Sequence, residues 1–332
     1  MRRLLPGLAA VALVACEGRQ SVTGGDGLHS GQFNSLFLIF LLVTAFFYLL
    51  VIAFLVAAVV RRRGRAEDRP EKSGGEGGFR LILIGWVALV ALGLTGLTAA
   101  SYFSDAAAGG ARPANAIRIA VTANQWWWDV RYLDPVPANT IRTANELHLP
   151  VGVPVHIQLK SNDVIHSFWV PNLAGKQDLI PGRITDITLI PRKEGLYRGQ
   201  CAEFCGLQHA HMALDVTVEP METFEAWRRS QLRPAPPPAT PLAVTGYNYI
   251  MTQECSACHN ISGTPASGQV APDLTHIASR RSIGAGTFPM SRGHLYAWIA
   301  DPQSAKPGNH MPYVGLEPHE LHGVVAYLET LK

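Results

Sequence analysis

The stretch Cys201-Ala-Glu-Phe-Cys205-Gly-Leu-Gln-His209-Ala-His-Met212 places two thiols, two imidazoles, a thioether and a carboxylate within twelve residues. Thiolate, imidazole and thioether together are the soft donors that suit copper. Zinc would accept the two cysteines and the two histidines, but it has no use for a methionine. A disulfide between Cys201 and Cys205 would leave His209 and Met212 without an explanation. The stretch therefore predicts a copper site, which needs further donors from another segment.

A second motif, Cys255-Ser-Ala-Cys258-His259, has the spacing of a haem c attachment site. Cys255 and Cys258 would form the thioethers, and His259 would be the proximal iron ligand. A thioredoxin-like dithiol is the competing interpretation, but a histidine follows directly and no βαβ pattern surrounds the motif. A methionine as sixth ligand would raise the haem potential towards that of copper. Met311, in Lys306-Pro-Gly-Asn-His-Met311-Pro312, is favoured over Met290, with His310 as a third candidate.

The N-terminus is typical of a secreted or membrane-anchored protein. Residues 1–15 consist of a short basic start and an apolar run that is too short to cross a bilayer, which indicates a signal peptide. The run ends in Leu13-Val-Ala-Cys16, which is similar to a bacterial lipoprotein box. Cys16 is then expected to be the lipidated mature N-terminus, although any small-residue cleavage site looks similar.

Two uncharged runs follow, and residues 30–105 are expected to form a transmembrane hairpin. Its helices should span about 33–60 and 81–104, and each run is long enough to cross the bilayer. Residues 61–80 carry seven Lys/Arg against four Asp/Glu, so the positive-inside rule places this loop in the cytoplasm. A buried hairpin of a soluble protein is the alternative, but the lengths of the runs and the basic loop argue against it.

The 332 residues are enough for about two domains. The net charge of +3 gives no sign of a nucleic-acid partner. Residues 112–232 contain short alternating segments punctuated by Pro and Gly, which predict a β-sandwich or barrel closed by a helix at about 221–232. The segments are Ile117–Val121, Val155–Leu159, Ile184–Ile190 and Leu214–Val218.

A proline-rich run, residues 233–241, predicts a stiff and extended linker. Residues 242–332 then predict a small all-α electron carrier, in which a covalently held haem supplies part of the core. Its helices are expected at Val244–Gln253, His294–Ala300 and Glu317–Leu331.

His166 is the candidate for the missing copper ligand. It lies in Asp163-Val-Ile-His166-Ser-Phe-Trp-Val-Pro171, at the end of an expected strand. A lone histidine among apolar residues is usually a core or surface residue, but the thiol-rich stretch requires partners.

Three segments together resemble subunit II of the haem-copper cytochrome c oxidases. They are 163–171, Pro181-Gly-Arg183 and 199–212, and the resemblance covers roughly residues 30–230. It implies a cupredoxin-like β-sandwich with a binuclear CuA centre. Carried over position by position, it implies that Cys201 and Cys205 bridge two coppers, one completed by His166 and Met212 and the other by His209 and the main-chain carbonyl of Glu203. The match favours His209 over His211.

The resemblance assigns two further roles. The carboxylate of Glu203 would bind Mg²⁺ at the interface with subunit I, although a solvated glutamate is the simpler alternative. Trp126, in Asn124-Gln-Trp126-Trp-Trp-Asp129, would be the point at which electrons arrive from the donor haem, as an exposed aromatic docking patch. Large apolar side chains in such a run also serve packing. The family often has a Glu at the start of the second membrane helix. Here the nearest one is Glu76, so a role in proton uptake is left unassigned.

The expected protein is thus a two-pass protein of the bacterial inner membrane, with a cupredoxin-like domain and a cytochrome c domain on the periplasmic side. Electrons would pass from cytochrome c, or another haem c donor, to haem c, to CuA and then to subunit I, where O₂ is reduced to water with proton translocation. Subunit III is a further expected partner. The alternatives are the copper domain of a nitrous oxide reductase-like system and a copper-binding lipoprotein without turnover. Quinol oxidase subunit II resembles this architecture but lacks the two cysteines.

Overall fold

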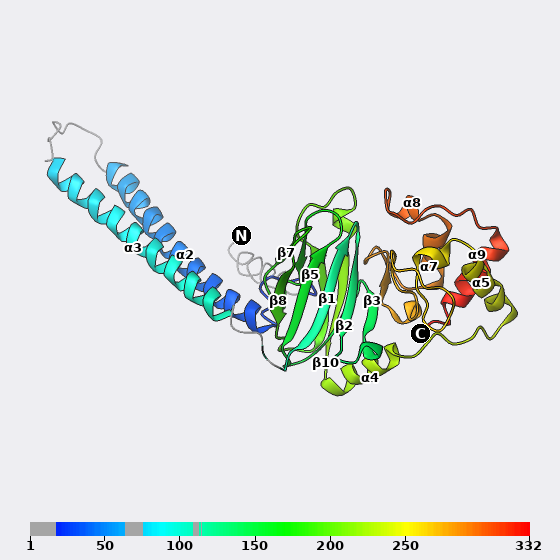
Figure 1. Ribbon diagram of the computed structural model, residues 1–332. Helices are drawn as coiled ribbons and strands as arrows, with labels where there is room; N and C mark the ends of the chain where they lie inside the picture. Colours follow the sequence, from blue (N-terminus) through cyan, green and yellow to red (C-terminus); the bar gives the residue numbers. More distant parts are fainter. Residues whose placement is uncertain (1–17, 64–75, 109–112, 114) are drawn as a thin grey trace, which may run out of the picture. The chain divides into compact units, whose positions relative to one another are not determined.

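The structure is a computed structural model that describes residues 18–63, 76–108, 113 and 115–332 (Figure 1). The expected signal peptide, Cys16 and most of the basic loop lie outside the described residues. The described residues fall into two compact units. One unit comprises residues 31–63 and 76–108, and the other comprises residues 18–30, 113 and 115–332.

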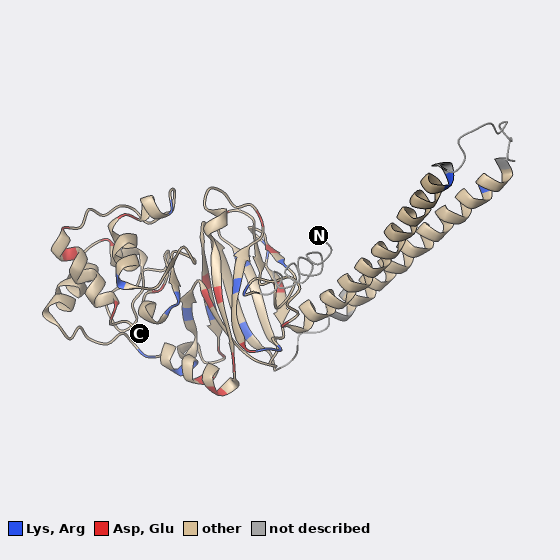
Figure 2. Ribbon diagram, turned by 180° about the vertical axis from the view of Figure 1, so that it is seen from behind, with Lys and Arg blue, Asp and Glu red and all other residues tan. Residues whose placement is uncertain are grey.

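The first unit consists of two long helices, α2 (Leu28–Arg63) and α3 (Glu76–Ala108). Both begin before and end after the uncharged runs of the sequence, because no proline interrupts the flanking residues. By length and composition both could cross a membrane. Figure 2 shows no charged residue along the middle of either helix. Phe47 of α2 packs edge-on against Trp86 of α3, with the ring centroids 5.9 Å apart, so the helices form the expected hairpin.

The second unit begins with a sandwich of two five-stranded sheets, named here the sandwich (residues 117–219). One sheet has the order β3-β2-β1-β5-β8 and the other β4-β10-β9-β6-β7. The four strands that alternation predicted are all present, and the buried residues of β1 are Ile119, Val121 and Ala123, every second position. The bounds are β1 (Ile117–Asn124), β2 (Trp127–Leu133), β3 (Ile141–Ala144), β4 (Glu146–Pro150), β5 (Val155–Ser161), β6 (His166–Trp169), β7 (Gln177–Leu179), β8 (Thr185–Leu189), β9 (Gly195–Cys201) and β10 (Ala213–Glu219).

Two aromatic side chains fill the centre of the sandwich. Trp128 and Phe168 are fully buried and meet edge-on with ring centroids 6.0 Å apart. Helix α4 (Met221–Gln231) covers one end, where its Trp227 packs against Tyr132. The helix agrees with the expected 221–232. The fold class expected for this region is therefore confirmed.

The residues before α2 were not expected to belong to the sandwich, but they are fastened to it. The Arg198 N–H donates to the carbonyl of Arg19 (2.7 Å), and the Leu28 N–H donates to that of Ile190 (2.9 Å). The amide side chain of Asn172 accepts from the Ser21 N–H at 2.8 Å. Polar residues of this kind carry no periodicity, so sequence patterns could not assign them to a sheet.

The C-terminal domain (residues 241–332) is mostly helical. Its elements are α5 (Pro241–Thr252), α6 (Cys255–Cys258), β11 (Ser282–Ile283), β12 (Phe288–Pro289), α7 (Arg292–Ala300), α8 (Pro302–Ala305) and α9 (Pro318–Leu328). Thr240 caps α5 by accepting from the Ala243 N–H. Helices α5 and α9 cross at Gly246 and Gly323, where a Cβ on Gly246 would lie 2.0 Å from the Gly323 carbonyl oxygen. The crossing therefore depends on the absence of a side chain.

The proline-rich run was expected to be a stiff and extended linker. It has no helix or strand, but its start lies on the C-terminal domain. The Ala235 N–H donates to the Ser262 carbonyl at 2.9 Å. The imidazole Nε2 of His276 lies 3.1 Å from the carbonyl oxygen of Arg233. The start of the linker is thus fixed to the surface of the C-terminal domain.

Candidate copper and haem sites

The thiol loop, Cys201–Met212, connects the antiparallel strands β9 and β10. It closes through a hydrogen bond from the Cys201 N–H to the Met212 carbonyl (3.0 Å). The sulfur atoms of Cys201 and Cys205 lie 3.7 Å apart, and both residues are only 2% exposed. Gly206 has φ +111°, and a Cβ there would meet the Trp126 ring at 3.1 Å. Glycine at this position therefore lets the loop turn beneath an indole.

The other donors predicted from the sequence surround the two sulfur atoms. Nδ1 of His166 lies 3.8 Å from the Cys201 sulfur, and the Glu203 carbonyl oxygen lies 3.3 Å from it. Nδ1 of His209 and Sδ of Met212 lie 3.6 and 3.9 Å from the Cys205 sulfur. His166 begins β6, whose Phe168 pairs with Cys201 of β9, so sheet register brings it to the loop. The structure thus gathers every predicted copper donor around one pair of thiols.

The two thiols differ in pKa. The pKa of Cys201 is held well below that of an ordinary thiol, chiefly because of the hydrogen bond between its sulfur and that of Cys205. The pKa of Cys205 is raised, first by that same hydrogen bond and then by burial. Two buried thiolates so close together need a cation between them. The donor set of two thiolates, two imidazoles and a thioether fits copper, the soft metal that the sequence predicted.

Asp163 fixes the orientation of His166, which is fully buried. Its Oδ1 lies 2.7 Å from Nε2 of the imidazole, so the opposite nitrogen faces the sulfur atoms. Although burial works in the opposite direction, the hydrogen bonds to Asp163 and Cys201 raise the pKa of His166. Burial alone would raise the pKa of Asp163. The hydrogen bonds from His166 and from the N–H groups of Gln125 and Val164 outweigh it, so the pKa of Asp163 is lowered. A carboxylate behind a histidine is the usual outer partner of a metal ligand.

Trp126 lies over the thiol loop. Its Nε1 donates to the Cys205 carbonyl at 2.9 Å, and Nε2 of Gln125 donates to the same oxygen at 2.8 Å. The expectation of an exposed aromatic patch is wrong, because Trp126 is only 7% exposed. Gly308 of the C-terminal domain lies near its ring. A Cβ built on that glycine would be 3.8 Å from the Trp126 ring. The other two tryptophans of the run differ: Trp128 is a core residue, and Trp127 is half-buried.

The two histidines of the thiol loop face different surroundings. His211 is exposed, and its Nδ1 lies 2.8 Å from the side-chain oxygen of Gln208. His209 faces the Cys205 sulfur, which agrees with the preference for it. The carboxylate of Glu203 is half-buried and has no hydrogen bond or ion pair within the described parts of the chain.

The haem motif occupies the short helix α6, which places Cys255 and Cys258 one turn apart on one side. Neither cysteine is in a disulfide. Nδ1 of His259 lies 2.7 Å from the Pro272 carbonyl oxygen, which leaves Nε2 free to bind iron. Burial lowers the pKa of His259, so the imidazole is neutral, as a ligand must be. These residues fit a covalently attached haem.

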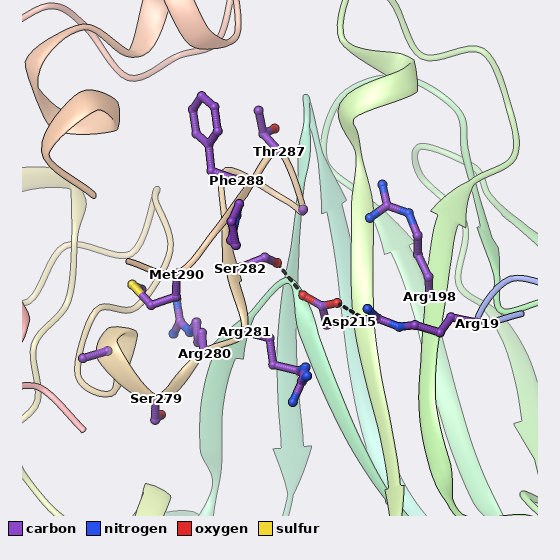
Figure 3. A pocket seen from close by; sticks show the side chains of 13 residues that line it. Arg19, Arg198, Asp215, Ser279, Arg280, Arg281, Ser282, Thr287, Phe288 and Met290 are labelled. Atoms are coloured by element: carbon purple, nitrogen blue, oxygen red, sulfur yellow. Dashed lines mark hydrogen bonds and ion pairs between the residues drawn. The ribbon is translucent and has the colours of Figure 1, made fainter. Parts of the chain in front are cut away.

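The two candidate axial methionines lie in different places. Met311 follows a tight turn in which Asn309 accepts from the Met311 N–H, and the Gln303 amide donates to the Met311 carbonyl, both at 2.8 Å. Met290 lines a cavity of about 640 Å³ between residues 278–290 and the sheet that contains β9 and β10 (Figure 3). Asp215 at this cavity accepts from Arg19 and from Ser282. Apart from Met290, the cavity is lined by none of the candidate metal or haem ligands.

Three functional residues were missed from the sequence. Asp163 could have been found, because it precedes His166 by three residues in the matching segment. Gln125 and Lys306 gave no signal in the sequence, because both side chains donate hydrogen bonds to main-chain carbonyl groups of distant segments. Lys306 is 2% exposed, and burial lowers its pKa to about 7.

Two family models match the chain. Residues 129–219 match "Cytochrome C oxidase subunit II, periplasmic domain". Residues 243–332 match "Cytochrome c". The first match implies copper and the second implies haem c.

Similar proteins carry the same description. The cytochrome c oxidase subunit 2 of Alkalihalophilus pseudofirmus is 32% identical over 247 residues, which cover 74% of this chain and 70% of the relative. That of Bacillus sp. (strain PS3) is 33% identical over 67% of this chain and 64% of the relative. The crystal structure of the periplasmic domain of subunit II from Bradyrhizobium japonicum is 29% identical over 36% of this chain and 95% of that chain, with a TM-score of 0.34. On the strength of the sequence relatives, the chain belongs to the cytochrome c oxidase subunit II family, with a cytochrome c domain at its C-terminus.

Proposed function

We propose that this chain carries electrons from a haem c donor, through its own haem c and a binuclear CuA centre, to subunit I of a haem-copper oxidase. Subunit I would reduce O₂ to water with proton translocation. The observation that carries the proposal is the pair of buried thiols 3.7 Å apart, with His166, His209 and Met212 within 3.9 Å of a sulfur.

The copper ligands proposed are those gathered at the thiol loop. Cys201 and Cys205 would bridge two coppers, His166 and Met212 would complete one, and His209 with the Glu203 carbonyl would complete the other. Bound copper would supply a one-electron couple shared between two metals. The protein's contribution is rigidity, because strands β6, β9 and β10 hold the ligands, and Asp163 holds His166. Ligands that do not move keep the rearrangement on electron transfer small.

The haem ligands proposed are Cys255, Cys258 and His259, with Met311 at the sixth position. The Pro272 carbonyl fixes the His259 ring, and the turn at Asn309 fixes the main chain of Met311. A His/Met pair would keep the haem potential high enough for a donor to copper. Trp126 would lie on the path between the two centres, because it contacts both the thiol loop and Gly308.

The partners and location follow from the membrane hairpin and the family. The chain would be a two-pass protein of the bacterial inner membrane, with the sandwich and the C-terminal domain on the periplasmic side. Subunit I, and also subunit III, would contact it in the bilayer. The Glu203 carboxylate, which lacks a partner among the described residues, would bind Mg²⁺ at the interface with subunit I. Cys16 would be lipidated.

Metal analysis of the full chain tests the copper assignment. The protein purified with copper should contain two copper ions per chain, and Cys201→Ser or Cys205→Ser should lose both, because each thiolate bridges the pair. His211→Ala is the matched control on the same loop and should keep both. One copper ion per chain, or retention of both in either cysteine variant, would rule out the bridged pair. Co-purification with a haem a-containing partner separates an oxidase subunit from a nitrous oxide reductase-like protein or a free copper lipoprotein.

A further inference from the structure

Lys306 of the C-terminal domain has its ammonium group buried between two parts of the chain. Its Nζ donates to the carbonyl oxygens of Trp126 (2.7 Å), His211 (2.8 Å) and Gly284 (3.0 Å). The first two acceptors belong to the sandwich side, and the third belongs to the C-terminal domain. An ammonium group has three donors, and here all three are used. A buried charge is tolerated only when it is hydrogen-bonded in this way.

The residues that follow Lys306 also lie on the thiol loop. The Gln208 amide donates to the Pro307 carbonyl at 2.7 Å. Gly308 has φ +81°, and a Cβ there would lie 3.2 Å from the Leu207 side chain. The turn that ends at Met311 is therefore held against the loop by Lys306 on one side and Gln208 on the other.

Further contacts join the same two parts of the chain. Arg142 of β3 donates to the side chain and the carbonyl of Gln269, both at 2.9 Å. The Ala213 N–H of β10 donates to the Ala285 carbonyl at 2.9 Å. Lys306 differs from these because it is a buried charge, and it holds the carbonyl of Trp126 itself.

We infer that Lys306 is a positioning residue that locks the C-terminal domain onto the thiol loop over Trp126. The inference rests on the proposed function and goes beyond it by naming what holds donor and acceptor together. With Trp126 covered, a separate cytochrome c has no access to that indole. An external donor must therefore reduce the resident haem c, and the domain acts as a fixed relay instead of a tethered shuttle.

A lysine-acetylation footprint of the full chain, loaded with copper and haem, tests the locked arrangement without measuring activity. Lys306 should resist acetylation, because its amine is buried and engaged. Lys332 is an exposed lysine of the same domain and should be labelled readily. Labelling of Lys306 as fast as Lys332 would overturn the inference.

Replacement of the lysine tests its positioning role. Lys306→Met keeps the apolar stem but removes three charge-assisted hydrogen bonds, so the ratio of docked to undocked domain should fall about tenfold or more. In single-turnover measurements the transfer from haem c to copper should slow and become heterogeneous, while the haem and copper spectra stay unchanged. Added soluble cytochrome c should then reduce the copper directly. Lys332→Met should behave as the wild type.

The outcomes separate the two proposals. If wild-type protein lacks haem c or the two-copper signal, the proposed function fails. If both centres load and Lys306→Met transfers electrons as the wild type does, only the role of Lys306 fails. Should Lys306→Met not fold, Arg142→Gln weakens the same docking from the far side. It should increase acetylation of Lys306, and an unchanged footprint would count against the locked arrangement.

Discussion

The crossing of α5 and α9 should not tolerate a methyl group at Gly246. A Cβ there would lie 2.0 Å from the carbonyl oxygen of Gly323, 2.2 Å from its carbonyl carbon and 2.6 Å from the Val324 nitrogen. All three atoms belong to the main chain of a helix, so no side chain can turn aside to relieve the clash. The Gly246→Ala variant must therefore push the two helices apart along their whole contact.

The expected loss of stability follows from two opposing effects. Overpacking of a close contact costs about 1–3 kcal/mol, and more where only main chain is available to move. Alanine in a helix interior recovers about 0.8–1 kcal/mol relative to glycine. A clash this severe should lie at or above the upper end of that range, so a net loss of about 2 kcal/mol is expected. For a domain of this size that corresponds to a fall in Tm of roughly 8–16 °C.

Thermal unfolding of the haem-loaded full chain, followed at the haem absorbance, measures this loss. Gly293→Ala in α7 is the matched control, because a Cβ there meets nothing within 4 Å. It should be neutral or stabilising by up to about 1 kcal/mol. If Gly246→Ala unfolds within about 0.5 kcal/mol of the wild type, which is the usual range for an innocuous surface change, the close helix contact is wrong.

Three further predictions concern the sites. Asp163→Asn should weaken copper binding by about 10–100-fold through loss of the oriented histidine, as measured by titration against a competing chelator, and unchanged affinity would remove Asp163 from the site. His209→Ala should alter the copper spectrum and lower copper content, whereas His211→Ala should change neither, and the opposite pattern would exchange their roles. Met311→Ala should keep its covalent haem but lose the low-spin His/Met spectrum, while Met290→Ala should retain that spectrum. Loss of the spectrum in Met290→Ala alone would transfer the axial role to Met290.

The parts of the structure that were predictable had strong local signals. Uncharged runs predicted α2 and α3, and period-two alternation predicted β1, β5, β8 and β10. The shorter strands, such as β6 and β7, have only four and three residues and no clear alternation. The copper donors were predictable because the thiol loop required a further ligand, for which His166 was the candidate, and the family resemblance then carried the whole ligand set over. Their proximity agrees with the assignment, while their roles stay predictions.

The features that were not predictable depend on contacts between distant residues. Trp126 reads as an exposed aromatic in isolation, but it is buried, with Gly206 of the thiol loop and Gly308 of the C-terminal domain both close to its ring. The proline-rich run reads as a spacer, but its main chain is hydrogen-bonded to Ser262. Lys306 reads as an ordinary surface lysine, because its acceptors are carbonyl groups, which any sequence can supply. Docking between domains leaves no periodic signature in a sequence.

The most direct test of the account is EPR spectroscopy of the copper-loaded full chain. The account predicts a mixed-valence signal of one unpaired electron shared by two copper nuclei, because Cys201 and Cys205 are close enough to bridge both metals. Cys205→Ser should abolish the shared signal. A signal from a single copper nucleus in the wild-type chain, or no copper signal at all, would contradict the binuclear centre and with it the proposed path of electrons.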